Sequence, residues 1–174
     1  MSVSFYWRRM SATVVASASP KELASMVPSR FDDRFDDLRR GNLAMGTHDN
    51  AYLMHFVLTS AAADPDGPSR LPVYGGTVRA EGEQDPEYGF LGVEVIVQDP
   101  GEVREAAQFL SEAPVGEWAE RLDAVLACEV VGLGYSTPWD ARWAASLVAD
   151  LWELRNFMVA AAEAGDAVVK VEVA

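Results

Sequence analysis

Cysteine, histidine and basic residues are scarce in this chain, and each scarcity excludes something. The 174 residues include one cysteine and two histidines, so Cys128 has no partner for an internal disulfide, as is usual in a reducing compartment. Lys and Arg number 14 against 27 Asp and Glu, which gives a formal net charge of −13. Because such a charge repels nucleic-acid phosphates and anionic membranes, we expect neither as a partner.

Long apolar runs are missing as well. No segment approaches the roughly 18 apolar residues of a membrane-spanning helix. The first ten residues, MSVSFYWRRM, place two arginines before a stretch rich in Ala and Val at residues 11–19. Ser and Thr interrupt that stretch too often for the apolar part of a signal peptide. The sequence therefore predicts a cytoplasmic protein.

Length and composition are those of one globular domain. Domains usually run about 100–200 residues, and a chain of this length buries enough surface to need no disulfide or metal. Hydrophobic residues make up 49% of the chain and charged residues 24%, which is ordinary for a folded protein. No internal repeat or long linker divides the sequence, so we expect a single domain over residues 1–174.

Four segments rich in β-branched and aromatic residues predict strands. They are residues 2–8, 72–79, 88–97 and 167–173. In the first, Val3, Phe5 and Trp7 share one face, and the last alternates from Val169 onward. Polar residues 80–87 form a loop between the two middle strands. We expect a small sheet of about four strands, mixed or antiparallel.

Capping signals and apolar spacing predict the helices. Ser19-Pro20-Lys21-Glu22 and Asp99-Pro100-Gly101-Glu102 each combine a capping side chain, a proline at the first helical position and a glutamate three residues after the cap. Further helices are expected at residues 31–40, about 47–59, 116–127 and about 137–164, the last ending at Gly165. Residues 61–72 are expected to form a surface loop.

Apolar side chains at helical spacing are expected to be buried. In residues 31–40 these are Phe31, Phe35 and Leu38. In residues 116–127 they are Trp118, Leu122, Val125 and Leu126, and in the last helix they are Trp143, Leu147, Leu151, Leu154 and Met158.

The order of these motifs resembles a known family. The segments that carry the resemblance are Ser19-Pro20-Lys21-Glu22-Leu23, residues 52–59, Gly75-Gly76, residues 89–103 and residues 163–169. Together they resemble the YfbM-like family of small bacterial proteins of unknown function. Residues 10–18 are additional to that pattern, and residues 128–138 lack its acidic, Trp-containing linker. The resemblance implies one compact α+β domain, with a long C-terminal helix before a terminal strand, and implies no reaction or ligand.

The two histidines are the first candidates for chemistry. His48 and His55 lie seven residues apart in the expected helix 47–59, so two turns would place them on one side, with Asp49 nearby as a further metal ligand. A structural role is the simpler interpretation, and we predict no metal or cofactor. An enzymatic alternative remains open, namely a hydrolase or transferase site that combines His55 with Tyr52 and an acid such as Glu94.

Other reactive-looking groups have structural interpretations. The acids at positions 32, 33, 36 and 37 are expected on a solvated helix face, neutralised by nearby arginines. Cys128 lies between Ala127 and Glu129, and an acidic neighbour raises a thiol pKa, so we expect a small buried side chain rather than a nucleophile. Gly75-Gly76 and Gly132-Leu133-Gly134 match no phosphate-binding fingerprint and are expected to form turns.

Aromatic residues around the glycine-rich break at residues 132–134 form the candidate binding site. Trp139 and Trp143 lie one helical turn apart, with Arg142 between them and Tyr135 before them. Tyr, Trp and Arg are favoured at binding hot spots, although aromatic residues at helical spacing also suit a core. The predicted binding residues are Tyr135, Trp139, Arg142 and Trp143, together with Tyr52 and His55.

These observations favour a non-enzymatic protein that binds a basic protein partner. The acidic charge would accelerate association with such a partner and would act less strongly as salt rises. An antidote that covers a cationic toxin is one version of this hypothesis. Self-association through exposed aromatic side chains is a third possibility, so both a monomer and a homodimer are open.

Overall fold

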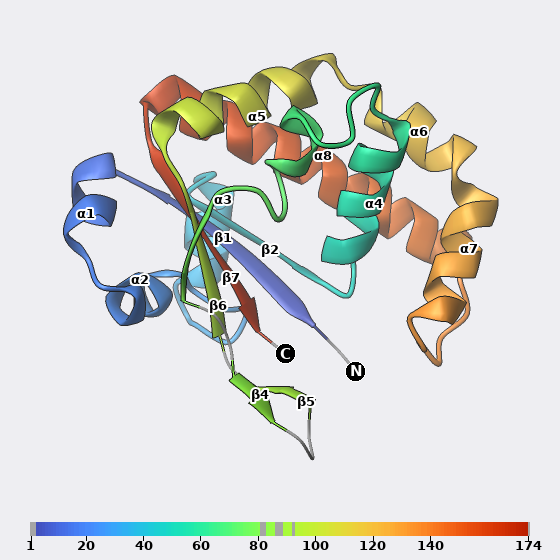
Figure 1. Cartoon of the computed structure of the whole chain (residues 1–174), viewed down its shortest axis with the longest axis horizontal. Coiled ribbons are helices and arrows are strands. Elements are labelled where there is room, and N and C mark those ends of the chain that lie inside the picture. The colour runs from blue at the N-terminus through green and yellow to red at the C-terminus, as the bar shows by residue number, and fades with distance from the viewer. Residues whose placement is uncertain (1–2, 81–82, 86–88, 92, 174) are drawn as a thin grey trace.

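One antiparallel sheet organises the chain (Figure 1). The computed structural model describes residues 3–80, 83–85, 89–91 and 93–173. Among these residues, five strands form the sheet in the order β2-β1-β7-β6-β3, and every neighbouring pair is antiparallel. The strands are β1 (Ser4–Met10), β2 (Ala44–His48), β3 (Thr77–Ala80), β6 (Val93–Gln98) and β7 (Ala167–Val173). The predicted α+β class is confirmed, with one strand more in the sheet than expected.

A second, two-stranded ribbon projects from the sheet (Figure 1). It consists of β4 (Glu83–Asp85) and β5 (Gly89–Leu91), which pair antiparallel. The loop expected at residues 80–87 therefore contains a strand. The strand expected at 88–97 is divided into β5 and β6, and residues 81–82, 86–88 and 92 of these two segments lie outside the described part of the chain. The strand expected at 72–79 is shortened to β3.

Helices cover both faces of the sheet and enclose two hydrophobic cores. Phe5 and Trp7 point into the larger core, and Tyr6 points into the smaller one, because successive side chains of a strand face opposite ways. The larger core is covered by α4 (Ala51–Ala61), α5 (Pro100–Glu112), α6 (Val115–Arg121), α7 (Asp123–Gly132) and α8 (Ala141–Ala164). The smaller core is covered by α1 (Ala12–Ser17), α2 (Pro20–Met26) and α3 (Phe35–Arg40).

β7 lies at the centre of the sheet and is covered on both faces. Its first five residues are all buried, including Lys170, which has no exposed surface. The alternation predicted from Val169 onward is present in the sequence but does not separate a buried face from a solvated one. Ser4 pairs with Val173 across β1 and β7, so the two strand ends meet at one end of the sheet.

The helix caps follow the sequence signals. Ser19 and Asp99 form capping boxes with Glu22 and Glu102, as predicted. Gly165 ends α8 in the left-handed conformation, at φ 70°. Each side-chain cap of this kind stabilises a helix by about 1 kcal/mol. Such caps depend on a few neighbouring residues, which explains why the sequence alone reveals them.

The beginning of α4 differs most from the prediction. Residues 44–48 form edge strand β2 against β1, so His48 lies in a strand and α4 begins only at Ala51. Asp49 connects the two elements at φ 66°, a left-handed conformation that Asp adopts more readily than most residues. His48 and His55 therefore do not share a helix face, and the geometry assumed for a histidine metal pair is wrong.

Several other expected segments are shorter or divided. The helix expected at 31–40 begins only at Phe35, and Phe31 is 81% exposed. The helix expected at 116–127 is divided at Leu122 into α6 and α7, which leaves Val125 exposed. α8 begins four residues later than expected, and a short 3-10 helix, Pro68–Arg70, lies in the expected loop.

Candidate functional site

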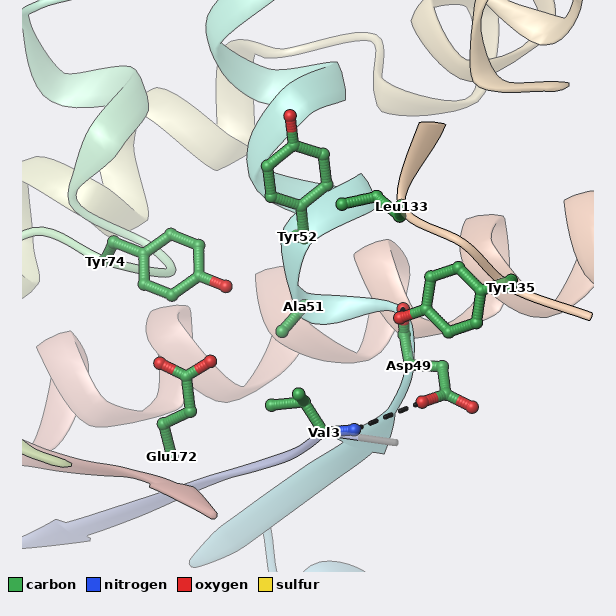
Figure 2. Close-up of a pocket in the computed structure, with 8 residues that line it drawn as sticks. All are labelled: Val3, Asp49, Ala51, Tyr52, Tyr74, Leu133, Tyr135 and Glu172. Carbon is green, nitrogen blue, oxygen red and sulfur yellow. Dashed lines mark hydrogen bonds between the residues drawn. The ribbon is translucent and has the colours of Figure 1, made fainter. Parts of the chain in front are cut away.

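A cavity of about 260 Å³ opens at the end of the sheet where β1 begins and β7 ends (Figure 2). Five segments of the chain contribute to its wall, and three tyrosines and two carboxylates are among the side chains. The described lining residues are Val3, Asp49, Ala51, Tyr52, Tyr74, Leu133, Tyr135 and Glu172. We call it the tyrosine cavity.

A buried lysine of the sheet, Lys170 on β7, holds the segment that carries Tyr74. Lys170 Nζ donates to the carbonyl oxygens of Leu71 at 2.5 Å, Val73 at 2.9 Å and Gly75 at 2.7 Å. Burial lowers the pKa of Lys170 well below its usual range. The three acceptors act in the opposite direction, because they match the three N–H bonds of an ammonium group and a neutral amine has two.

Two glycines allow this segment to lie against the sheet. A Cβ atom at Gly75 would lie 2.7 Å from Leu71 Cα, and one at Gly76 would lie 2.7 Å from the Val97 carbonyl oxygen. Gly76 also has φ 122°, a conformation that L side chains rarely adopt. The turn predicted from these glycines is thus a close backbone approach that fixes Tyr74.

Tyr74 is directed into the cavity by aromatic packing on its other side. Its ring meets Phe5 and His55 edge-on, with centroids 5.5 Å and 5.0 Å away. Figure 2 shows its hydroxyl pointing into the cavity beside the carboxylate of Glu172. Burial raises the pKa of Tyr74, and the negative charges of Glu172 and Glu94 raise it further. The phenol is therefore protonated at neutral pH.

Glu172 faces a second acid across the sheet. It lies directly opposite Glu94 in the β6–β7 register, so both side chains are on the face that carries the tyrosine cavity. Burial raises the pKa of Glu172 above its ordinary value, and repulsion from Glu94 adds to the effect. Like charges placed opposite each other cost about 0.2–1 kcal/mol. None of the described residues that line the cavity is basic.

Asp49 and Tyr135 close the other side of the cavity. The Asp49 carboxylate accepts a hydrogen bond from the Val3 backbone N–H at 3.3 Å, and the Asp49 carbonyl accepts one from the Tyr135 hydroxyl at 3.2 Å. His48 lies just outside, with Nε2 3.5 Å from Asp49 Oδ2 and Nδ1 3.0 Å from Ser4 Oγ.

The predicted aromatic residues gather beside this cavity. The Trp143 ring contacts Tyr135 edge-on at 5.3 Å and Trp139 at 5.6 Å, measured between centroids. All three are half-buried against the larger core, so they combine core packing with accessible surface. Tyr52 lines the same cavity as Tyr135. Arg142 is exposed and does not line it.

A polar network fixes Trp143 in this cluster. Trp143 Nε1 donates to Asn50 Oδ1 at 2.7 Å, and Asn50 Nδ2 donates to Asp150 Oδ2 at 2.8 Å. The Thr47 hydroxyl donates to the same carboxylate oxygen at 2.5 Å. Burial raises the pKa of Asp150, and these two hydrogen bonds counteract that effect. The network ties α8 to the β2–α4 connection and so supports the cavity.

A second concavity of about 630 Å³ lies between α6 and α8. Small residues of the two helices create the space, and two acids and one tryptophan lie along it. It is lined by Gly116, Ala119, Glu120, Asp123, Trp139, Ala144, Ala145, Leu147 and Val148. Trp139 Nε1 donates to Asp123 Oδ1 at 2.8 Å, which holds the indole in place. We call this the α6–α8 groove.

His55 lies behind Tyr74 rather than in the cavity. Burial lowers its pKa, as do the charges of Arg70 and Lys170, so the imidazole is neutral at pH 7. Glu94 lies opposite Glu172 in the sheet, and its negative charge raises the pKa of Tyr74. The ring of Tyr74 is in direct contact with His55. The enzymatic alternative, a hydrolase or transferase site around His55, Tyr52 and Glu94, stays a prediction.

The remaining candidates can be placed as well. Within the described ranges, no three His, Cys, Asp or Glu side chains lie close enough to hold a metal ion. Asp32 pairs with Arg34 at 2.7 Å, and Arg40 pairs with Asp37, as expected for a solvated acidic face. Cys128 is exposed, so its predicted burial is wrong.

Sequence reasoning did not identify Tyr74, Glu172 or Lys170. Two signals were available. Glu172 and Lys170 interrupt a strand that is otherwise apolar, and Tyr74 precedes a glycine pair. The register of the sheet brings these residues close to the aromatic residues near position 135. Neither signal reveals that register, so the sequence does not show the approach.

Comparisons with known proteins identify the fold. No protein-family model matches the sequence, and no curated protein matches it. Among solved structures, YfbM from Escherichia coli, described as a protein of unknown function, is similar with a TM-score of 0.54 and 16% identity, over 98% of this chain and 99% of that one. The resemblance to the YfbM-like family is thus confirmed for the fold. No described helix has the length and apolarity to cross a membrane.

Proposed function

We propose that this chain of YfbM-like fold is a non-enzymatic protein that binds a basic protein partner. The observation that carries the proposal is the tyrosine cavity, in which the Glu172 carboxylate faces Glu94 and no described lining residue is basic. The α6–α8 groove lies close by and adds Glu120 and Asp123. We refer to the cavity, the groove and the aromatic cluster between them as the aromatic end.

Charge supports the choice of a basic partner. With 27 acidic against 14 basic residues, the field of the protein attracts cationic surfaces over a Debye length of about 10 Å at 0.1 M salt. Fields of this kind mainly increase the association rate. The half-buried rings of Tyr135, Trp139 and Trp143 supply the short-range contacts, since Tyr and Trp are common hot-spot residues.

The test compares two charge reversals of equal size at different places. Glu117→Lys/Glu120→Lys changes two exposed acids on α6, the helix that borders the α6–α8 groove and contributes Glu120 to it. Asp33→Lys/Asp36→Lys changes exposed acids near α3, on the opposite face of the sheet. Partners are captured from the native host at low salt, and the recovered protein is purified and its direct binding is measured by surface plasmon resonance.

A stoichiometric basic protein is expected, with an association rate that falls at least about tenfold from 0.05 to 0.3 M NaCl. The α6 reversal should weaken binding about tenfold or more, and the α3 reversal should have a much smaller effect. Recovery of no basic partner under several low-salt conditions, or equal effects of the two reversals, contradicts the proposal.

We also propose the cytoplasm as the compartment, supported by the exposed, unpaired Cys128. Both a monomer and a homodimer stay open as predictions of the oligomeric state. Sedimentation equilibrium at high protein concentration distinguishes the two.

A further inference from the structure

We infer that the tyrosine cavity binds an alkylammonium group, either the end of a lysine side chain or a small free compound, namely a protonated amine or a quaternary ammonium compound. The inference deepens the proposed function and rests on it for the lysine source, whereas the free compound would be a ligand in its own right. Size, wall chemistry and charge each support this ligand class.

The size of the cavity suits a small group. Sites for drug-sized ligands usually measure about 300–1,000 Å³, and this cavity measures about 260 Å³. It has room for a substituted ammonium head with a short chain. Tyr52 and Leu133 at its rim are 38% and 43% exposed, so the cavity is accessible from solvent.

Two of the three tyrosines have hydroxyl groups that are already engaged as donors. The Tyr52 hydroxyl lies 3.2 Å from Glu129 Oε2 and donates to it, and the Tyr135 hydroxyl donates to the Asp49 carbonyl. An anion would need such donors, and two of the three are already engaged. Aromatic rings attract organic cations, and tyrosine-lined cages are a known solution for quaternary ammonium groups.

The charge in the cavity is negative, and no basic side chain is among the described residues that line it. Glu172 and Glu94 face each other, and Asp49 lies at the opposite rim. The nearest lysine on the same face of β7, Lys170, is fully buried and already donates to three carbonyl oxygens. An ammonium group in the cavity would therefore supply the missing positive charge beside Glu172.

The positive end of the α4 dipole is a weaker, opposing effect. α4 begins at Ala51 beside the cavity, and a helix N-terminus carries about half a positive charge. Two acidic side chains, Asp49 and Glu172, line the same cavity and Glu94 lies beside one of them, so the net field favours a cation. A divalent metal fits less well, because no three suitable ligands meet within the described residues and most of the wall is apolar or aromatic.

Choline and 3,3-dimethylbutan-1-ol form the central comparison, since the two molecules have nearly the same shape and only choline is charged. Isothermal titration calorimetry on the full chain should show choline binding at least about tenfold tighter than the neutral alcohol. Equal affinities, or no binding of choline at high millimolar concentration, overturn the inference.

Matched variants locate the binding. Glu172→Gln should weaken choline binding about tenfold, and Asp33→Asn, the same change on an exposed acid near α3, should leave it unchanged. Tyr52→Leu should weaken choline binding several-fold. Tyr52→Phe, which keeps the ring, should bind choline about as tightly as the wild type. Choline binding that does not respond to Glu172→Gln and Tyr52→Leu places the ligand elsewhere and overturns the inference.

Two further arms separate the sources of the ammonium group and the two proposals. A peptide with trimethyllysine that binds at least about tenfold tighter than free trimethyllysine identifies a protein ligand; equal affinities identify a free compound. If a basic partner binds and is insensitive to Glu172→Gln, while choline does not bind, the cavity inference fails and the proposed function stands. If choline binds and no basic partner is found, the reverse holds.

Discussion

Glu172 is the residue at which stability and binding conflict. It is half-buried, it faces Glu94 on β6, and it shares the cavity with Tyr74, while Lys170 on the same face is engaged with carbonyl oxygens. Burial and Glu94 raise the pKa of its carboxyl group in the folded protein. A carboxyl group whose pKa is higher in the folded state favours folding at low pH and loses that contribution as pH rises through the raised pKa.

Replacing this carboxylate should therefore stabilise the protein at neutral pH. Glu172→Gln removes the repulsion from Glu94, so the free energy of unfolding at pH 7 should rise by about 0.5 kcal/mol, or about 2 °C in Tm. The gain should vanish below about pH 4, where the wild-type carboxyl group is protonated in both states. Calorimetry at pH 7 and about pH 3 measures both stabilities. A variant less stable than wild type at pH 7 would show that Glu172 has a favourable partner.

The segment before β3 is held by three side chains, and the buried Lys170 makes most of the hydrogen bonds, while Trp7 and Gln98 each donate one. Lys170 binds the carbonyl oxygens of Leu71, Val73 and Gly75, and Trp7 Nε1 donates to the Pro72 carbonyl at 3.0 Å. This hydrogen-bonded segment has no regular secondary structure of its own to satisfy these carbonyls. Its conformation, and hence the position of Tyr74, is set by residues far away in the sequence.

Lys170→Met tests that dependence. Methionine fills a similar volume but leaves the carbonyl oxygens of Val73 and Gly75 without their donor, while the Leu71 carbonyl keeps its hydrogen bond from Gln98 Nε2 at 2.8 Å. The free energy of unfolding should therefore fall by about 3–5 kcal/mol and Tm by about 10 °C. Lys21→Met, at an exposed position of α2, is the control and should change stability by less than about 0.5 kcal/mol. Similar small effects of both changes in urea unfolding would show that Lys170 does not hold the segment.

At the scale of elements, local signals were predictable and non-local ones were not. The capping boxes at Ser19 and Asp99 and the glycine stop at Gly165 are determined within a few residues. β2 was missed because residues 44–48 include Ala, Gly and His, which have little strand preference; pairing with β1 determines their conformation. The single helix predicted at residues 116–127 was also wrong, because the chain divides at Leu122 into α6 and α7.

At the scale of the whole molecule, the sequence predicted the fold class and part of the candidate site. Tyr135, Trp139 and Trp143 do gather, and Tyr52 meets Tyr135 at one cavity. The acidic half of that cavity was not predictable. It requires the terminal strand to lie between β1 and β6, so that Glu172 is next to Glu94 and opposite Tyr74, and one sequence does not specify strand order.

The central claim is that cationic groups bind at one end of this acidic molecule and not over its surface in general. Its most direct test is an NMR titration of ring-labelled tyrosines with choline. Tyr52, Tyr74 and Tyr135 line the cavity, while Tyr6 is buried in the smaller core on the other face of the sheet and serves as an internal reference. We predict saturable shifts of the three cavity tyrosines and none for Tyr6. Uniform or unsaturable shifts of Tyr6 together with the three cavity tyrosines would contradict the claim.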